Sequence, residues 1–357
     1  MRAFPMEMTL FEDSKTGVMI RQLTDQSCIN HHPFFLIPAY DEQMQWIFFV
    51  SHRSGSPQIY GFEQESSAIV QFTDVEDLTE WSVHPDLSGR FVYFTTKIGG
   101  WQLDVASGKV RSMFHYGEAA SRASGMVAGG MGTTALSHHG TYWAFPFNTR
   151  DGVIIKRVDT RNGNVCEVTT HDAVGHMQFC PDDEELLYFA GNFTERLWTV
   201  KIDGSGKKKH GTREKGQWIT HESWIPGTRE LMYVDWPHAV RSISIDDGTV
   251  KTICRINAWH AICDASGQRV VADTNSPDRG INVFNVSAAG EPQVICYPQA
   301  SNAGEHWHHP FPYEDGPIKV VAPQHTHPHP RFSPDGRRIV YTSDVSGHAQ
   351  LYEALLP

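Results

Sequence analysis

The segment Phe332-Ser333-Pro334-Asp335-Gly336-Arg337-Arg338-Ile339-Val340-Tyr341-Thr342-Ser343 combines a strand end, a Pro-Asp-Gly turn and a second strand rich in β-branched and aromatic residues. Proline fixes φ at the start of such a turn, and glycine accepts the positive φ that the turn requires. Two short strands joined so tightly predict a β-hairpin rather than a helix. The fold then depends on how often this unit recurs.

The unit recurs seven times along the 357 residues. Its turns lie at Asp41, Pro85-Asp86, His139-Gly140, Pro181-Asp182, Pro226-Gly227, Ser266-Gly267 and Pro334-Asp335. Neighbouring turns are 40 to 53 residues apart, except for a final gap of 68, which is close to the repeat of four-stranded propeller blades. We therefore predict an all-β, seven-bladed β-propeller forming a single domain over residues 1–357. A β-sandwich, or two smaller β domains, is the alternative.

The two ends of the chain indicate how the ring closes. Val18–Asp25 reads like Ala68–Asp74, the fourth strand of the first unit, but it precedes any first strand. The last unit ends just after its third strand, Gln350–Tyr352. We expect the N-terminal strand to join and complete the last blade, because this leaves no open edge in the ring.

Composition narrows the class of partner. The chain has 30 Lys and Arg against 41 Asp and Glu, and the net charge of -11 argues against nucleic acid and anionic lipid as partners. We find no signal-peptide core and no apolar run of membrane-spanning length, so we expect a cytoplasmic protein without a membrane partner. The oligomeric state stays open. The cysteines form no CxxC pair and are expected to be buried thiols rather than disulfides: Cys28, Cys166, Cys180, Cys254, Cys263 and Cys296.

The 20 histidines are the unusual feature. In a propeller the first strand of each blade lines the central tunnel, so residues at one phase of the repeat surround one mouth of it. His176, His221 and His329 each lie five residues before the proline of their turn, and His260 lies six before Ser266. A single histidine there would be expected to have a structural role, but four in phase favour a metal site.

The strongest local signal is Gln324-His325-Thr326-His327-Pro328-His329-Pro330. His327 and His329 would share one face of an extended strand, and the prolines would keep it extended. Histidine and amide ligands suit several divalent transition metals, so these residues leave the metal open. We find no GxSxG elbow, Walker loop or GxGxxG before a helix, which argues against hydrolase and nucleotide-binding functions.

Two further segments are distinctive. The glycine-rich run Ser124–Gly132 follows no strand-then-helix pattern and is expected to connect blades. Glu305–Pro310 contains His306, His308 and His309 and lies in the long final gap. We expect this insertion to be either a wall over the site or a plain packed loop, and not a source of metal ligands.

With these residues in place, the chain resembles the oligogalacturonate lyases, seven-bladed propellers that cleave short pectin oligomers in the bacterial cytoplasm. Thr326–Pro330, with the turn and strand that follow, is similar to the C-terminal signature of that family, and Thr220–Pro226 and Glu195–Trp198 are similar more weakly. The resemblance implies a manganese site at His260, Gln324, His327 and His329. It also implies that His221 is the general base, that Arg196 binds an acidic oligosaccharide substrate, and that His176 lies in the active site.

The reaction so implied is β-elimination on a uronate, which leaves a 4,5-unsaturated product. The third blade lacks the long hairpin expected between Ala135 and Ile154, and the insertion near His306 is not a family feature. A lyase acting on another uronide or modified glycoside therefore stays open. A non-catalytic propeller similar to TolB, binding a protein partner, is the alternative from another class.

Overall fold

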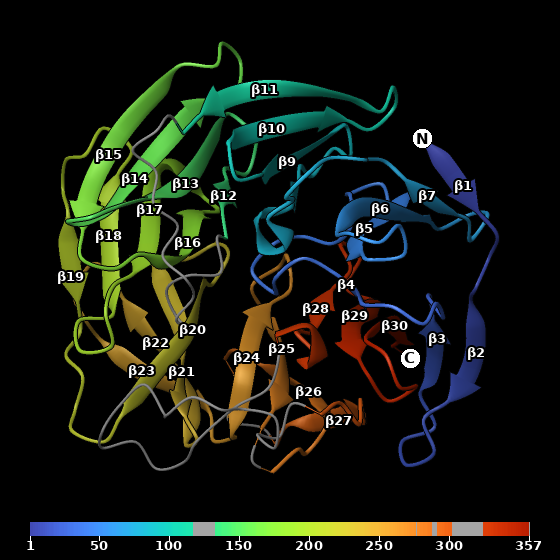
Figure 1. Cartoon of the computed structure of the whole chain (residues 1–357). Coiled ribbons are helices and arrows are strands. Elements are labelled where there is room, and N and C mark those ends of the chain that lie inside the picture. Colours follow the sequence, from blue (N-terminus) through green and yellow to red (C-terminus); the bar gives the residue numbers. More distant parts are fainter. Residues whose placement is uncertain (117–132, 276, 288–290, 302–323, 357) are drawn as a thin grey trace.

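A computed structural model of the chain describes residues 1–116, 133–275, 277–287, 291–301 and 324–356. Within this part, thirty strands form seven antiparallel sheets, which stand around a common centre as the blades of a propeller (Figure 1). The only helical elements described are two short 3₁₀ turns, η1 (Glu80–Ser82) and η2 (Gln324–Thr326). The predicted all-β, seven-bladed fold is therefore confirmed.

The blades follow one another along the chain, and each begins with the strand nearest the centre (Figure 1). The first three are β4 (Asn30–His31), β5 (Trp46–Ser51), β6 (Gln58–Glu63) and β7 (Ile69–Gln71); β8 (His84–Pro85), β9 (Phe91–Thr95), β10 (Gly99–Asp104) and β11 (Lys109–His115); and β12 (Ala135–Leu136), β13 (Tyr142–Thr149), β14 (Gly152–Asp159) and β15 (Val165–His171). The next three are β16 (Gly175–Cys180), β17 (Asp183–Ala190), β18 (Leu197–Lys201) and β19 (Lys208–His210); β20 (Trp218–Trp224), β21 (Glu230–Trp236), β22 (Ala239–Ser244) and β23 (Val250–Cys254); and β24 (Ala258–Cys263), β25 (Arg269–Thr274), β26 (Ile281–Asn285) and β27 (Gln293–Cys296).

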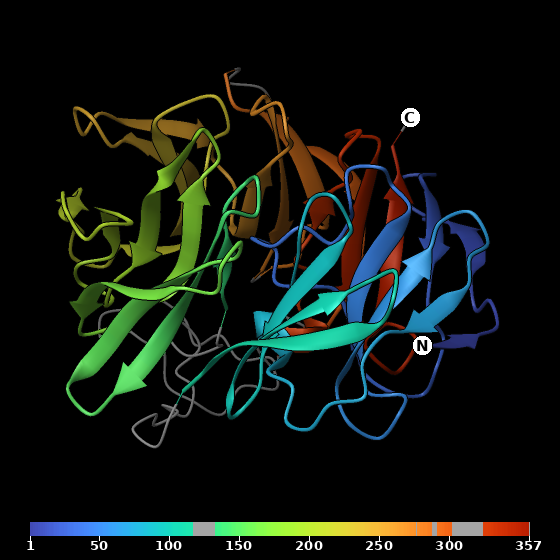
Figure 2. The same ribbon diagram turned by 90° about the horizontal axis from the view of Figure 1, so that it is seen from above.

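The last blade joins both ends of the chain, as predicted. β28 (Arg331–Phe332), β29 (Arg338–Ser343) and β30 (Gln350–Leu355) are completed by β3 (Met19–Gln22), whose Ile20 pairs with Ala354. Figure 2 shows the blue N-terminal strands beside the red C-terminal ones. Two strands extend this arrangement beyond the prediction: β2 (Thr9–Glu12) pairs with β3, and β1 (Arg2–Phe4) pairs with β7 of the first blade.

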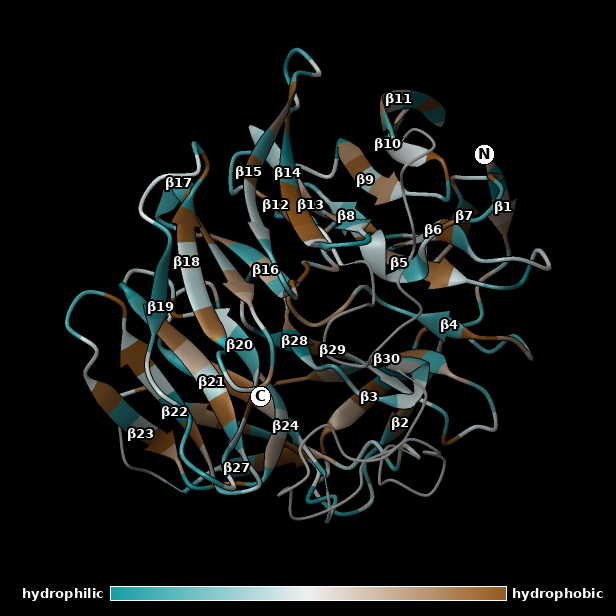
Figure 3. Cartoon of the chain, turned by 60° about the vertical axis from the view of Figure 1, so that its left-hand side comes forward, coloured by the Kyte–Doolittle hydropathy of each residue, from teal (hydrophilic) through white to brown (hydrophobic). Residues whose placement is uncertain are grey.

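Apolar contacts between neighbouring blades stabilise the ring. The cluster at the closure contains Leu23 from the N-terminal segment, Ile47 from the first blade, and Val340 and Leu351 from the last, all fully buried. Burying such a side chain contributes about 1.5–3 kcal/mol. In Figure 3 hydrophobic residues follow strands such as β18 and β21, while hydrophilic residues gather at the turns.

The cysteines are unpaired, as expected, but not all of them are buried. Cys166 is exposed and Cys28 is only partly covered. Cys166 lies on β15, the outermost strand of its blade, where most residues are exposed or only partly buried. In the described part of the chain, no helix has the length and apolarity needed to cross a membrane.

Candidate active site

Three of the in-phase histidines lie in the first strands of consecutive blades, each at a break in strand register. His176 falls between Gly175 and Gln178 in β16, His221 falls in the equivalent break of β20, and His260 in that of β24. A β-bulge of this kind turns a side chain away from its regular direction. His176 and His221 adopt positive φ angles of 48° and 51°, which L-residues adopt at a cost of about 1–3 kcal/mol.

The His-Pro-His segment corrects one prediction. His327 and His329 do not lie on an extended strand, because the regular strand β28 begins only at Arg331 and His329 has a φ of 47°. The two rings nevertheless approach each other, with centroids 5.6 Å apart. The left-handed backbone at His329, and not the alternation of side chains along a strand, brings the two rings together.

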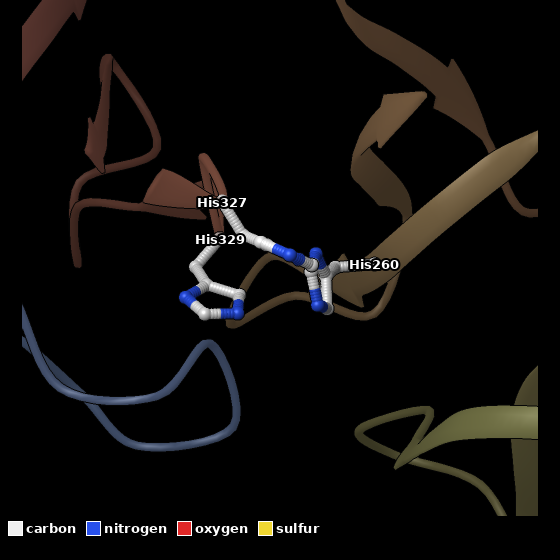
Figure 4. Close-up of side chains that lie close together, drawn as sticks. All are labelled: His260, His327 and His329. Carbon is white, nitrogen blue, oxygen red and sulfur yellow. The ribbon is translucent and has the colours of Figure 1, made fainter. Parts of the chain in front are cut away.

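Three histidines converge into a group that fits a metal ion. One ring nitrogen from each of His260, His327 and His329 lies within 4.8 Å of the others, and all three residues are buried. Figure 4 shows the rings turned toward one another from β24 and from the segment before β28. The Nε2 atoms of His260 and His329 have no hydrogen-bond partner among the described residues. A buried polar atom without a partner is costly, so these nitrogens are suited to a cation.

Asp273 on β25 supports this group from behind. Its carboxylate accepts hydrogen bonds from Nδ1 of His260 at 2.8 Å and from the backbone N–H of His260 at 2.7 Å. The backbone N–H of His329 also donates to it at 3.2 Å. A carboxylate at Nδ1 places the ring proton there and leaves Nε2 of His260 with its lone pair toward the other two histidines.

Trp259 contacts the third histidine. Its indole N–H donates to Nδ1 of His327 at 3.0 Å. A neutral imidazole that accepts at Nδ1 carries its proton at Nε2. Binding a cation at either nitrogen therefore requires one of the two side chains to turn.

His221 lies beside the three histidines in a desolvated setting. Its ring centroid is 4.3 Å from that of His260 and 4.9 Å from that of Trp259, and its Nδ1 has no partner within the described structure. Burial, together with the neighbouring imidazoles and Arg196, lowers the pKa of His221 well below 6.5. The ring is therefore neutral near pH 7 and able to accept a proton.

Arg196 and His176 meet at a carboxylate that the sequence analysis did not single out. Glu222 accepts from Nε of Arg196 at 2.6 Å and pairs with Nδ1 of His176 at 2.8 Å, and all three side chains are buried. Burial opposes the charge of Glu222, but Arg196 and His176 lower its pKa to about 2. One edge of the Arg196 guanidinium thus holds Glu222 and not a substrate.

An apolar loop between β4 and β5 forms the floor of the site. Phe34 and Phe35 are fully buried; the ring of Phe34 lies 5.1 Å from His329, and that of Phe35 lies 5.0 Å from His260. The blue loop below His329 in Figure 4 belongs to this N-terminal blade. Leu36 to Tyr40, which follow, line a separate cavity of about 610 Å³ at the end of the tunnel where the blade turns lie. The loop therefore separates the histidines from that cavity.

Some predicted features fall outside what the structure describes. Gln324 begins η2, directly before the histidine pair, but its side chain lies outside the described part. The glycine-rich run Ser124–Gly132 and the insertion with His306, His308 and His309 also lie outside the described residues.

Sequence signals for the missed residues are weak. Asp273 is a buried charged residue that directly follows the apolar residues Val270 to Ala272 of β25, which is unusual for a buried strand. Phe34 and Phe35 stand in an apolar run outside the repeated strands. The only sequence signal for Glu222 is its position directly after His221.

Together, these features define a propeller with a candidate metal centre and a neutral histidine at one mouth of its tunnel. A family model described as oligogalacturonate lyase matches residues 134–357, and the chain therefore belongs to the oligogalacturonate lyase family.

Similar proteins agree with this family. The oligogalacturonate lyase of Dickeya dadantii is 26% identical over 227 residues, and the oligogalacturonide lyase of Pectobacterium atrosepticum is 25% identical over 229 residues. Each alignment covers 56% of this chain and 55% of the relative, so the chain matches little more than half the length of these relatives.

Solved structures extend the likeness in fold to the whole chain. An oligogalacturonate lyase in complex with manganese has a TM-score of 0.84 at 20% identity, and the oligogalacturonate lyase of Vibrio parahaemolyticus has a TM-score of 0.85 at 20% identity. Both comparisons cover 100% of this chain and 98% of the other. The first two blades, outside the family match, thus share the fold.

Proposed function

We propose that this protein is a metal-dependent lyase that cleaves short oligogalacturonides by β-elimination and gives 4,5-unsaturated products. The observation that carries the proposal is the buried group of His260, His327 and His329 with neutral His221 against it. Membership of the oligogalacturonate lyase family supports the substrate class. We also propose that the protein acts in the cytoplasm.

His260, His327 and His329 would hold a divalent cation, and Gln324 is proposed as the fourth ligand. Manganese is the favoured metal, since a structural neighbour is described in complex with it. A bound cation would neutralise the uronate carboxylate and so make the neighbouring C5 proton more acidic. Asp273 would keep His260 in the tautomer that this requires.

Three further residues would act on the substrate. His221 would take the proton from C5, which its low pKa allows at neutral pH. The C4–O bond would then break as the C4=C5 double bond forms. We propose that Arg196 binds a second carboxylate of the substrate, and that His176 lies beside the same sugar.

The test is incubation of the metal-loaded protein with digalacturonate or trigalacturonate, followed by ultraviolet absorbance of the new conjugated double bond. His221→Ala is expected to keep the metal, measured by elemental analysis, and to lose about 10²- to 10⁴-fold in turnover. His238→Ala, an exposed histidine of the same blade, is the control and should match the wild type.

The outcomes separate the alternatives. If ultraviolet absorbance develops only with other uronides, the protein is a lyase of the same type that acts on a different uronide. No reaction with any uronide would favour a TolB-like binding propeller. A fully active His221→Ala variant would show that another group is the base.

A further inference from the structure

The position in the repeat that identified the histidines, five residues before the proline of the turn, is occupied by an acidic residue in the second blade. Glu80 lies five residues before Pro85, the same interval that separates His176 from Pro181. It begins η1, immediately before the innermost strand β8. The repeat therefore places Glu80 at the same mouth of the tunnel as the metal-binding histidines.

The first blade contributes an equivalent residue. His31 follows Asn30, which pairs with Ser51, the last residue of β5. His176 likewise follows Gly175, whose partner Ala190 is the last residue of β17. His31 thus occupies in the first blade the place that His176 occupies in the fourth.

These two residues meet in one cluster. Oε2 of Glu80 accepts hydrogen bonds from Nε2 of His31 at 3.1 Å and from Nε2 of His52 at 2.8 Å. The ring of His31 packs on Trp81 with centroids 4.2 Å apart, and Trp81 meets His329 edge to face at 5.6 Å. The cluster is therefore continuous with the metal-binding group.

The second oxygen of Glu80 is available to a ligand. Oε1 accepts no hydrogen bond from any residue that the structure describes, and the side chain is 30% exposed. Although burial opposes the charge, the bonds from His31 and His52 hold the pKa of Glu80 far below its usual range. An ionised carboxylate only accepts hydrogen bonds, so its partner must be a donor.

We propose that Glu80, held by His31 and His52, accepts hydrogen bonds from hydroxyl groups of the sugar next to the one at the metal. The inference rests on the proposed function and adds a binding subsite to it. The charge of Glu80 repels a carboxylate at that point, so the subsite also fixes which side of the neighbouring uronate turns toward the first two blades. These two blades lie outside the residues that the family model matches.

The Glu80→Gln substitution tests the subsite. The two imidazole N–H groups need an acceptor, so the amide oxygen would stay with them and the NH₂ group would replace Oε1 as a donor. We expect KM for digalacturonate and trigalacturonate to rise about tenfold, as for the loss of a hydrogen bond to a charged group, with kcat changed less than about threefold. Inhibition by monogalacturonate, which needs only the metal position, and the metal content should not change.

Glu12→Gln is the control, because Glu12 is exposed on the outer strand β2. If wild type and control cleave galacturonides and Glu80→Gln has the same KM, the subsite is refuted and the proposed function stands. If Glu80→Gln weakens monogalacturonate as much as the oligomers, Glu80 acts through the metal position and the subsite is again refuted. If neither wild type nor control cleaves any galacturonide, the proposed function and the subsite fall together.

Discussion

Replacing Asp273 by Asn should weaken metal binding without removing a ligand. The Asp273 carboxylate is buried and receives three hydrogen bonds, two from His260 and one from the backbone of His329. With its oxygen in the place of Oδ1, an Asn side chain would keep the bond from the backbone N–H of His260, but its NH₂ group would then face Nδ1 of His260 and the backbone N–H of His329. Nδ1 of His260 would have to accept, and the ring proton would move to Nε2, where the cation should bind.

The expected loss is about 10- to 100-fold in metal affinity, the usual effect of removing a carboxylate that supports a histidine ligand. This corresponds to about 1.4–2.7 kcal/mol of binding free energy. The buried bonds to a charged acceptor also contribute about 1.5–3 kcal/mol each to stability, so the variant should also unfold more easily.

Asp235→Asn is a matched control. Asp235 is a buried carboxylate at the equivalent position of β21, one residue before the end of the strand, and it accepts from Nε of Arg241 at 2.7 Å. Both variants should lose thermal stability, but only Asp273→Asn should lose affinity in a calorimetric titration with Mn²⁺. Equal Mn²⁺ affinity in Asp273→Asn and wild type would refute the role of Asp273 in orienting His260.

Two further predictions concern pH. Burial lowers the pKa of His84 to about 4, and its Nε2 accepts from the N–H of Leu136, so protonation opposes the fold. Between pH 6.5 and 4 the unfolded chain binds this proton more readily than the folded one, so the free energy of unfolding should fall on acidification through that window. His84 should account for about 2 kcal/mol of the fall by pH 5. Denaturant titrations of His84→Gln should show a smaller fall. Phe35→Ala should admit water beside His221 and raise the pKa of His221 toward 6.5. The acid limb of the pH profile of kcat/KM should then move to higher pH. An unchanged acid limb would show that Phe35 does not desolvate His221.

The architecture was predictable because the propeller repeats its turn. Each Pro-Asp-Gly or related turn fixes one hairpin locally, and seven such turns at blade spacing leave few folds that bury both faces of every sheet. The closure was predictable for the same reason, since Val18–Asp25 carries the pattern of a fourth strand without a blade of its own. The apolar loop with Phe34 and Phe35 was not, because it breaks the repeat between the innermost strand and its turn.

For the site, the sequence predicted which histidines lie near one another but not their detailed geometry. Phase along the repeat identified His176, His221 and His260 as neighbours, and the structure confirms that their rings gather, with centroids 4.3 Å apart for His221 and His260. Phase could not identify the left-handed backbone of His329 or the bulges, because these depend on packing between blades. The residues behind the rings were missed for a related reason: Glu222 and Asp273 come from strand positions that no motif marks.

Those residues behind the rings explain how one repeated position can have three uses. His260 has Asp273 at Nδ1, so its Nε2 is left as a ligand for a cation. His176 has Glu222 at the same atom, and Glu222 is itself held by Arg196, which fixes the orientation of the ring. The Nδ1 of His221 has no partner in the described structure, and its pKa is lowered by burial, so its ring is neutral and suited to accept a proton. The fold supplies the same imidazole three times, and the carboxylate that does or does not stand behind it determines whether the ring is suited to bind a metal, hold a position or accept a proton.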